Sequence, residues 1–122
     1  MALVLVIDDS IDNASLVRAI LNNAGHEVVV ALNGVDGFHQ ITALKPDVII
    51  LDLRLPGSEM DGWQLIQAVR GEPALHNIPI IVTSVEVMPE DRERAFNAGC
   101  NAFLSKPYSI RDLAQRIIEY TS

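Results

Sequence analysis

The stretch Val48-Ile49-Ile50-Leu51-Asp52 joins an uninterrupted apolar run, rich in β-branched residues, to a single carboxylate. Apolar runs of this kind, without polar alternation, are typical of strands that are covered on both faces. Four similar runs lie elsewhere in the chain, at Val4–Ile7, Val28–Ala31, Ile80–Thr83 and Ala102–Leu104. The sequence therefore predicts five short strands in a sheet that other elements cover.

Five amphipathic helices are predicted, one after each apolar run, from apolar residues at helical spacing. The second starts at Asn33-Gly34 and stops before Lys45-Pro46, and the fourth starts at Pro89 and stops at Gly99. Five strand–helix units with right-handed crossovers predict an α/β fold. We expect a doubly wound (βα)5 parallel sheet of five strands in the flavodoxin-like order 2-1-3-4-5, with helices on both faces. The apolar positions that define the other three helices are Ile11, Ala14, Val17, Leu21 and Ala24; Leu65, Ile66 and Val69; and Ile110, Leu113, Ala114, Ile117 and Ile118.

Length and charge restrict the classes of protein to consider. The 122 residues fit one domain, residues 1–122, and the formal net charge of −7 disfavours direct binding to nucleic acid or to a membrane surface. No apolar run approaches the roughly 20 residues of a membrane helix, and the first residues do not resemble a signal peptide. The single cysteine, Cys100, excludes an internal disulfide, so we expect a cytoplasmic protein.

Polar residues directly follow or end four of the predicted strands: Asp8-Asp9, Asp52, Ser84 and Lys106. The carboxyl ends of parallel strands meet at one edge of a sheet, where ligands bind, so we expect these side chains to converge. Three carboxylates in one crevice repel one another unless a cation is present, and oxygen ligands favour Mg²⁺. The sequence therefore predicts a Mg²⁺ site.

The same constellation can bind a phosphoryl group. Mg²⁺ and the Lys106 ammonium would neutralise the phosphoryl oxygens, and the Asp52 carboxylate would act as the nucleophile. Each residue alone has a simpler explanation, as a helix cap or the start of a solvated loop. Their joint placement at four strand ends favours the phosphoryl site.

With these motifs, the chain resembles the receiver domain of bacterial two-component response regulators, of the single-domain type. The resemblance covers the whole chain. It is carried by Asp8-Asp9, Leu51-Asp52-Leu53, Met60-Asp61-Gly62, Ser84, Ala98-Gly99 and Ser105-Lys106-Pro107. It implies a phosphorelay switch, not an enzyme with an external substrate, which receives its phosphoryl group from a histidine kinase or a histidine phosphotransfer protein. A downstream protein partner would then recognise the changed surface.

The resemblance also implies individual roles. Asp52 would be the phosphoacceptor, and Lys106 would contact the phosphoryl group. Asp9, Asp52 and the backbone carbonyl of Arg54 would bind Mg²⁺, with Asp8 acting through water.

Two further residues are implied as a switch. Ser84 would bond to the phosphoryl group and move toward it, and Phe103 would change rotamer in response. We expect the partner to recognise a face that includes Arg94, Phe103 and Arg111.

Three residues beside the site are expected to control its access to water. The side chains of Arg54 and Glu86 would pair over it, and Val85, where the family usually has a smaller residue, would add bulk. The loop of residues 56–60 is about two residues longer than the family's usual length.

Three alternatives use the same residues. An aspartyl phosphohydrolase resembling the haloacid dehalogenases would need a second aspartate where Arg54 stands. A pseudo-receiver would lack a key residue, yet all are present. A flavin-binding protein of this fold would need a phosphate-binding loop where Asp8-Asp9 would repel the phosphate.

Overall fold

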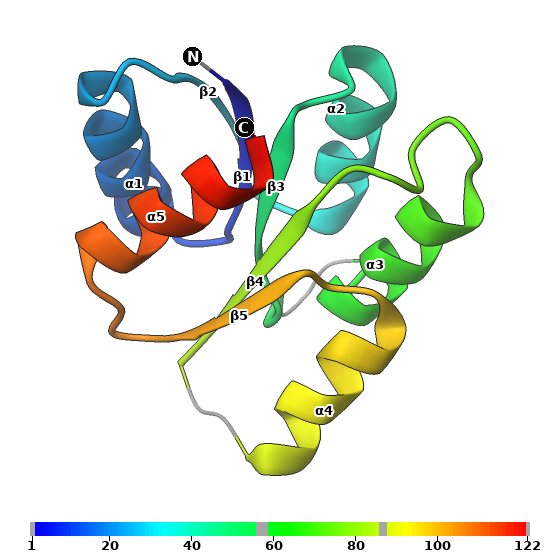
Figure 1. Cartoon of the computed structure of the whole chain (residues 1–122). Helices are drawn as coiled ribbons and strands as arrows, with labels where there is room; N and C mark the ends of the chain where they lie inside the picture. Colours follow the sequence, from blue (N-terminus) through cyan, green and yellow to red (C-terminus); the bar gives the residue numbers. More distant parts are fainter. Residues whose placement is uncertain (1, 56–58, 86–87, 122) are drawn as a thin grey trace.

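The computed structural model describes residues 2–55, 59–85 and 88–121. Its strands are β1 (Leu3–Ile7), β2 (Glu27–Ala31), β3 (Val48–Asp52), β4 (Ile80–Ser84) and β5 (Ala102–Ser105). Its helices are α1 (Ile11–Asn23), α2 (Gly34–Leu44), α3 (Gly62–Gly71), α4 (Pro89–Ala98) and α5 (Ile110–Thr121). All strand pairs are parallel, and their order is β2-β1-β3-β4-β5 (Figure 1). The predicted fold class and strand order are confirmed.

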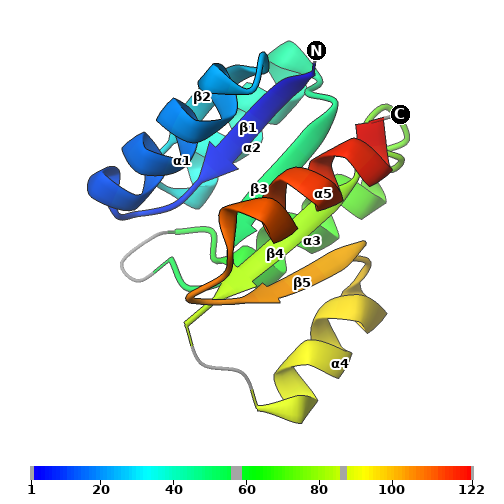
Figure 2. The same cartoon turned by 60° about the vertical axis from the view of Figure 1, so that its left-hand side comes forward.

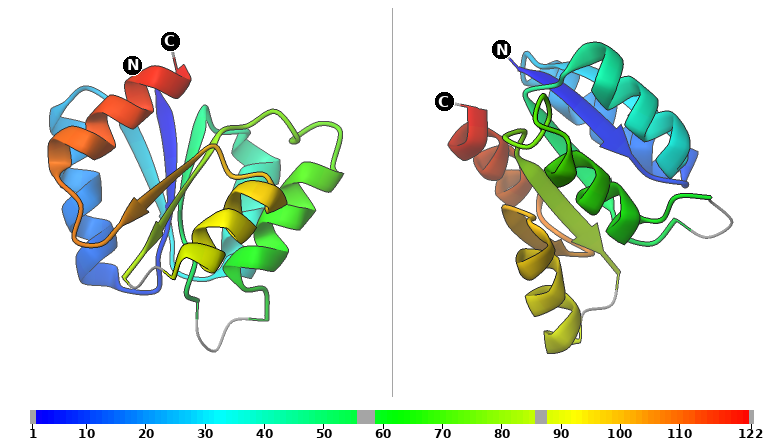
Figure 3. Two further views of the ribbon diagram at one scale, coloured as in Figure 1. Left: turned by 60° about the horizontal axis from the view of Figure 1, so that its bottom comes forward. Right: turned by 90° about the vertical axis from the view of Figure 1, so that its right-hand side faces the viewer.

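Helices cover both faces of the sheet. Helices α1 and α5 lie over one face (Figure 2), where Leu21 and Ile117 pack against strand residues such as Val6. Helices α2 and α3 lie over the other face (Figure 3), where Ile41 and Leu65 are buried. This double cover explains why the strands carry apolar residues without alternation.

Local signals at the helix ends behave as the sequence predicts. The Asn33 side chain accepts a hydrogen bond from the Asp36 amide at 2.8 Å at the start of α2, and Asp61 forms a capping box with Gln64 at the start of α3. Helix α4 begins with Pro89 and ends at Ala98, and the next residue, Gly99, caps it with a φ of 118°, in the left-handed region that favours glycine.

The helix faces differ in part from the prediction. Ile11, Ile110 and Ile118 have the spacing of buried residues, but they are 62%, 55% and 52% exposed. Ile11 and Ile110 are the first residues of α1 and α5, before the buried part of each helix begins. Ile118 follows the completely buried Ile117, so it lies on a side of α5 that is turned away from the sheet. Among the helices of the described residues, none has the length and hydrophobicity needed to span a membrane.

Candidate functional site

Three predicted site residues meet at the carboxyl edge of the sheet. The Lys106 Nζ donates to Asp8 Oδ2 at 3.2 Å and to Asp52 Oδ2 at 3.3 Å. Asp8 directly follows β1, Asp52 ends β3 and Lys106 directly follows β5. The strand order therefore brings Lys106 next to Asp8 and Asp52, which lie 98 and 54 positions before it in the sequence.

Backbone amides hold the other carboxylate oxygens in place. The Arg54 amide donates to Asp52 Oδ1 at 3.0 Å, and the Ser10 amide donates to Asp8 Oδ1 at 2.9 Å. Lys106 is itself fixed, because its backbone amide donates to the Ser84 carbonyl at 2.6 Å. Each buried carboxylate thus has a backbone amide donor and the shared ammonium, which lowers the cost of burying it.

Burial dominates the electrostatics of the site. The side chains of Asp8 and Asp52 are each 8% exposed, and that of Lys106 is 13% exposed. Burial raises the pKa of Asp52, against the opposing effects of Lys106 and the Arg54 amide, and Asp8 adds to the rise. For Lys106, burial acts to lower the pKa, but Asp52 and Asp8 together outweigh it and raise the value. The ammonium is therefore charged at neutral pH.

The three carboxylates of the predicted metal site also meet here. Carboxylate oxygens of Asp8, Asp9 and Asp52 lie within 4.8 Å of one another. Two oxygens bound directly to one Mg²⁺ are at most about 4.2 Å apart, so small movements, or a water between the ion and one carboxylate, would complete the fit. The exposed side chain of Asp9 leaves room for the waters that Mg²⁺ retains. The oxygen donors fit Mg²⁺.

The two predicted switch residues lie on neighbouring strands. Ser84 ends β4 and is 3% exposed, and Phe103 on β5 is 5% exposed. Val82, two residues before Ser84, and Phe103 belong to the same buried cluster, so Ser84 and Phe103 lie on the same face of the sheet. The Phe103 ring is in a buried orientation, and the Arg92 guanidinium lies 6.0 Å from its centroid.

The three residues of the predicted recognition face have different surroundings. Arg94 stacks on Trp63 of α3, with its guanidinium 4.0 Å from the ring centroid, so it faces α3. Arg111 is exposed on α5, and Phe103 is buried. Helical periodicity alone could not place Arg94, because the direction of α4 relative to α3 depends on how both helices pack on the sheet.

The residues predicted to control water access are only partly described. Arg54 is exposed, and Val85 is 58% exposed beside the site. Glu86 lies outside the described residues, and so do residues 56–58 of the long loop.

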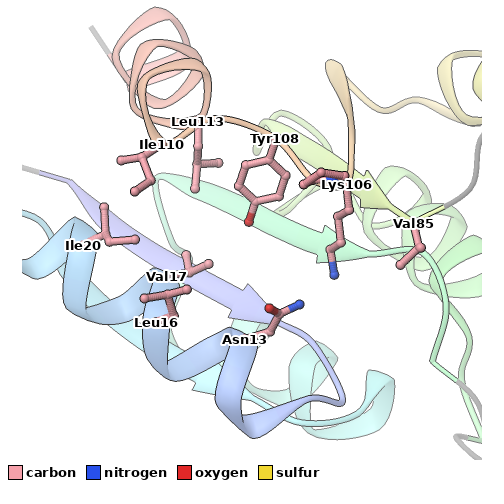
Figure 4. A pocket seen from close by; sticks show the side chains of 10 residues that line it. Asn13, Leu16, Val17, Ile20, Val85, Lys106, Tyr108, Ile110 and Leu113 are labelled. Carbon is pink, nitrogen blue, oxygen red and sulfur yellow. The ribbon is translucent and has the colours of Figure 1, made fainter.

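An apolar groove that the sequence did not reveal begins beside Lys106. This α1–α5 groove has a volume of about 480 Å³. Figure 4 shows Leu16 of α1 on one side, Ile110 of α5 on the other, and Val85 at the Lys106 end. The signal in the sequence was that Leu16 lies off the apolar stripe of the first predicted helix. In the structure the Leu16 side chain is 59% exposed. The residues that line the α1–α5 groove are Asn13, Leu16, Val17, Ile20, Val85, Lys106, Pro107, Tyr108, Ile110 and Leu113.

Comparison with known proteins identifies the family of this chain. The sequence profile of the response regulator receiver domain matches residues 4–118. The chain belongs to the response regulator receiver domain family. Receiver domains are phosphoacceptor switches of two-component signalling, which interact with histidine kinases and downstream effectors and bind Mg²⁺ at an acidic pocket.

Known proteins resemble this receiver domain in sequence and in fold. The polar-differentiation response regulator DivK of Brucella anthropi is 29% identical over 117 residues, which are 96% of this chain and 94% of that protein. The chemotaxis protein CheY4 of Vibrio cholerae is 30% identical, with a TM-score of 0.89 over 98% of each chain. The receiver domain of the sensor histidine kinase PA1611 from Pseudomonas aeruginosa is 25% identical, with a TM-score of 0.89 over 98% of this chain and 97% of that one. That structure has a magnesium ion coordinated in its active-site cleft.

Proposed function

We propose that this receiver domain, residues 1–122, accepts a phosphoryl group on Asp52 from the phosphohistidine of a histidine kinase or a histidine phosphotransfer protein. The observation that carries the proposal is the position of the Lys106 ammonium, 3.2 Å from Asp8 and 3.3 Å from Asp52. A fixed cation beside a buried carboxylate is what a transferring phosphoryl group requires.

In this reaction an Asp52 carboxylate oxygen attacks phosphorus, and the bond from phosphorus to the donor imidazole nitrogen breaks. The imidazole keeps the electron pair of that bond, and Lys106 offsets the charge on the phosphoryl oxygens. Mg²⁺, held by Asp9, Asp52 and the Arg54 carbonyl with Asp8 through water, would supply further charge neutralisation. The Arg54 amide keeps the Asp52 carboxylate oriented throughout.

We assign the α1–α5 groove to the phosphodonor protein. The groove begins at Lys106, so an occupant would hold its phosphohistidine beside Asp52. Leu16 and Ile110 are 59% and 55% exposed on its two sides, which leaves two large apolar side chains open to a partner. An amphipathic helix of the donor fits this shape and chemistry.

Output passes to a downstream protein partner. The added phosphoryl group would draw Ser84 toward Asp52, and Phe103 on the neighbouring strand would respond to the movement. The net charge of −7 argues against direct nucleic-acid binding and against a membrane surface, and we place the protein in the cytoplasm. Any catalysis would be limited to its own phosphorylation and dephosphorylation.

The acceptor is tested with acetyl phosphate and Mg²⁺, followed by intact-mass spectrometry. We expect one phosphoryl adduct on the wild type and on Asp112→Asn, whose carboxylate is exposed on α5, and none on Asp52→Asn. An adduct that persists in Asp52→Asn, or that forms equally well with excess EDTA, would refute the assignment.

The groove is tested by comparing two donors. We expect the double variant Leu16→Ala/Ile110→Ala to receive the phosphoryl group from a phosphorylated histidine phosphotransfer protein about tenfold more slowly than the wild type. The reason is that a buried apolar contact contributes roughly 1–2 kcal/mol to binding. Phosphorylation by acetyl phosphate should be unchanged, and Leu44→Ala, another exposed leucine at the end of α2, is the control. Equal slowing with both donors would place the effect at Asp52 instead of at the groove.

A further inference from the structure

We infer that Gly34 is a positioning residue for Mg²⁺: the first residue of α2 braces the backbone that supplies the Arg54 carbonyl. The inference rests on the metal site proposed above. Gly34 lies 18 positions before Asp52, is outside the predicted ligand set, and contacts Met60, two residues before the start of α3. It would act on the metal through Met60 and Gly62, because Gly62 lies against Leu53, the residue before Arg54.

The contact depends on the absence of a side chain at Gly34. A Cβ atom at this position would overlap the backbone carbonyl oxygen of Met60. The φ angle of Gly34 lies outside the left-handed region, so its backbone conformation is open to any residue. Close approach to the Met60 backbone, rather than conformational freedom, is therefore the reason for glycine here.

The start of α3 is packed against Leu53. The Leu53 amide donates to the Thr83 carbonyl at 3.0 Å, which holds Leu53 to β4. A Cβ on Gly62 would come within 2.6 Å of the Leu53 carbonyl oxygen, so α3 starts directly against the strand end. Arg54 follows Leu53, and its amide bonds to Asp52. Contact of Gly34 with Met60 thus restrains the start of α3, which in turn lies against Leu53, the residue before Arg54.

Helix α2 has little freedom to move away from Met60. One turn after Gly34, a Cβ on Gly37 would lie 2.7 Å from Ile7 Cδ1, and Ile41 is completely buried. A methyl group at position 34 would therefore displace Met60 rather than the helix. Mg²⁺ requires near-octahedral oxygens at about 2.0–2.1 Å, so even a small shift of the Arg54 carbonyl weakens binding.

The experiment is an NMR titration of the ¹⁵N-labelled full chain with MgCl₂, for wild type, Gly34→Ala and Gly71→Ala. Gly71 is the matched control, because a Cβ there would meet nothing within 4 Å. We expect Gly34→Ala to raise the Mg²⁺ Kd about tenfold, the effect typical of residues that orient metal ligands. The Arg54 amide resonance of metal-free Gly34→Ala should also move, since its bond to Asp52 is altered. Gly71→Ala should match the wild type in both measurements.

A folded Gly34→Ala protein that binds Mg²⁺ within about twofold of the wild type would overturn the inference, as would an equal loss in Gly71→Ala. If Gly34→Ala does not fold, Gly34→Ala with Met60→Gly gives the backbone at position 60 freedom to move aside. The double variant should then bind Mg²⁺ more weakly than Met60→Gly alone, and equal binding would also overturn the inference. A wild type that does not bind Mg²⁺ would instead refute the metal site of the proposed function, and this inference with it.

Discussion

Lys106→Met tests the charge balance of the site, because it removes the ammonium while keeping most of the apolar stem. At 3.2 and 3.3 Å, each Lys106–carboxylate attraction is about 5 kcal/mol at an effective dielectric constant of roughly 20. The cost of removing the ammonium and both carboxylates from water offsets most of this. We therefore expect a net loss of about 3–5 kcal/mol in the free energy of unfolding, as is usual when one partner of a buried ion pair is removed.

The loss should depend on pH in a defined direction. Lys106 opposes the rise in the pKa of Asp52 that burial causes, so its removal raises that pKa further above the ordinary 3.8. The native variant then holds a proton that the unfolded chain has released, and its stability falls as pH rises from 3.8 toward the folded pKa. The difference from the wild type should be largest near neutral pH and smallest near pH 4.

Urea unfolding in EDTA, followed by circular dichroism at about pH 7.5 and about pH 4.5, measures both effects. Arg116→Met is the control. Arg116 forms an ion pair with Glu119 at 3.1 Å, and the side chains of Arg116 and Glu119 are 43% and 39% exposed, so the pair should contribute less than about 1 kcal/mol. A Lys106→Met loss below about 1 kcal/mol at pH 7.5, or one that does not shrink at pH 4.5, would contradict the reasoning.

Three other changes give independent checks. Asp52→Asn should raise the metal-free stability at pH 7, because burial raises the pKa of Asp52 and so penalises its charged form; urea unfolding should show the gain fading as pH falls toward 3.8. Asp9→Asn should reduce the rise in Tm that Mg²⁺ produces, and a wild-type Tm that does not respond to millimolar Mg²⁺ would remove the metal site. Arg54→Ala and Val85→Ala should each speed hydrolysis of the Asp52 acyl phosphate several-fold by admitting water, measured by loss of the mass adduct; unchanged rates in both would end that hypothesis.

Much of the fold could be predicted from local sequence. The run of residues 48–51 indicated β3, and the structure extends that strand by one residue, to Asp52. Asn33 and Asp61 act as helix caps because their side chains bond to amides three residues later, a contact that requires no distant partner. The convergence of Asp8, Asp52 and Lys106 was also predictable, since parallel strands have their carboxyl ends at one edge of the sheet.

Other features were decided by the tertiary structure, because they depend on contacts between elements distant in sequence. Periodicity assigned Ile11, Ile110 and Ile118 to buried faces, but burial depends on which part and which side of each helix the sheet covers. The stacking of Arg94 on Trp63 depends on how α4 packs beside α3.

The same holds for the surroundings of the site. The α1–α5 groove exists because the strand order puts the first and last helices on one face. The contact of Gly34 with Met60 joins the start of one helix to a loop 26 positions later. Sequence alone determined which candidate groups are available for the chemistry, because side-chain type is local. Packing decided their distances and burial, because these follow from how the helices and strands fit together.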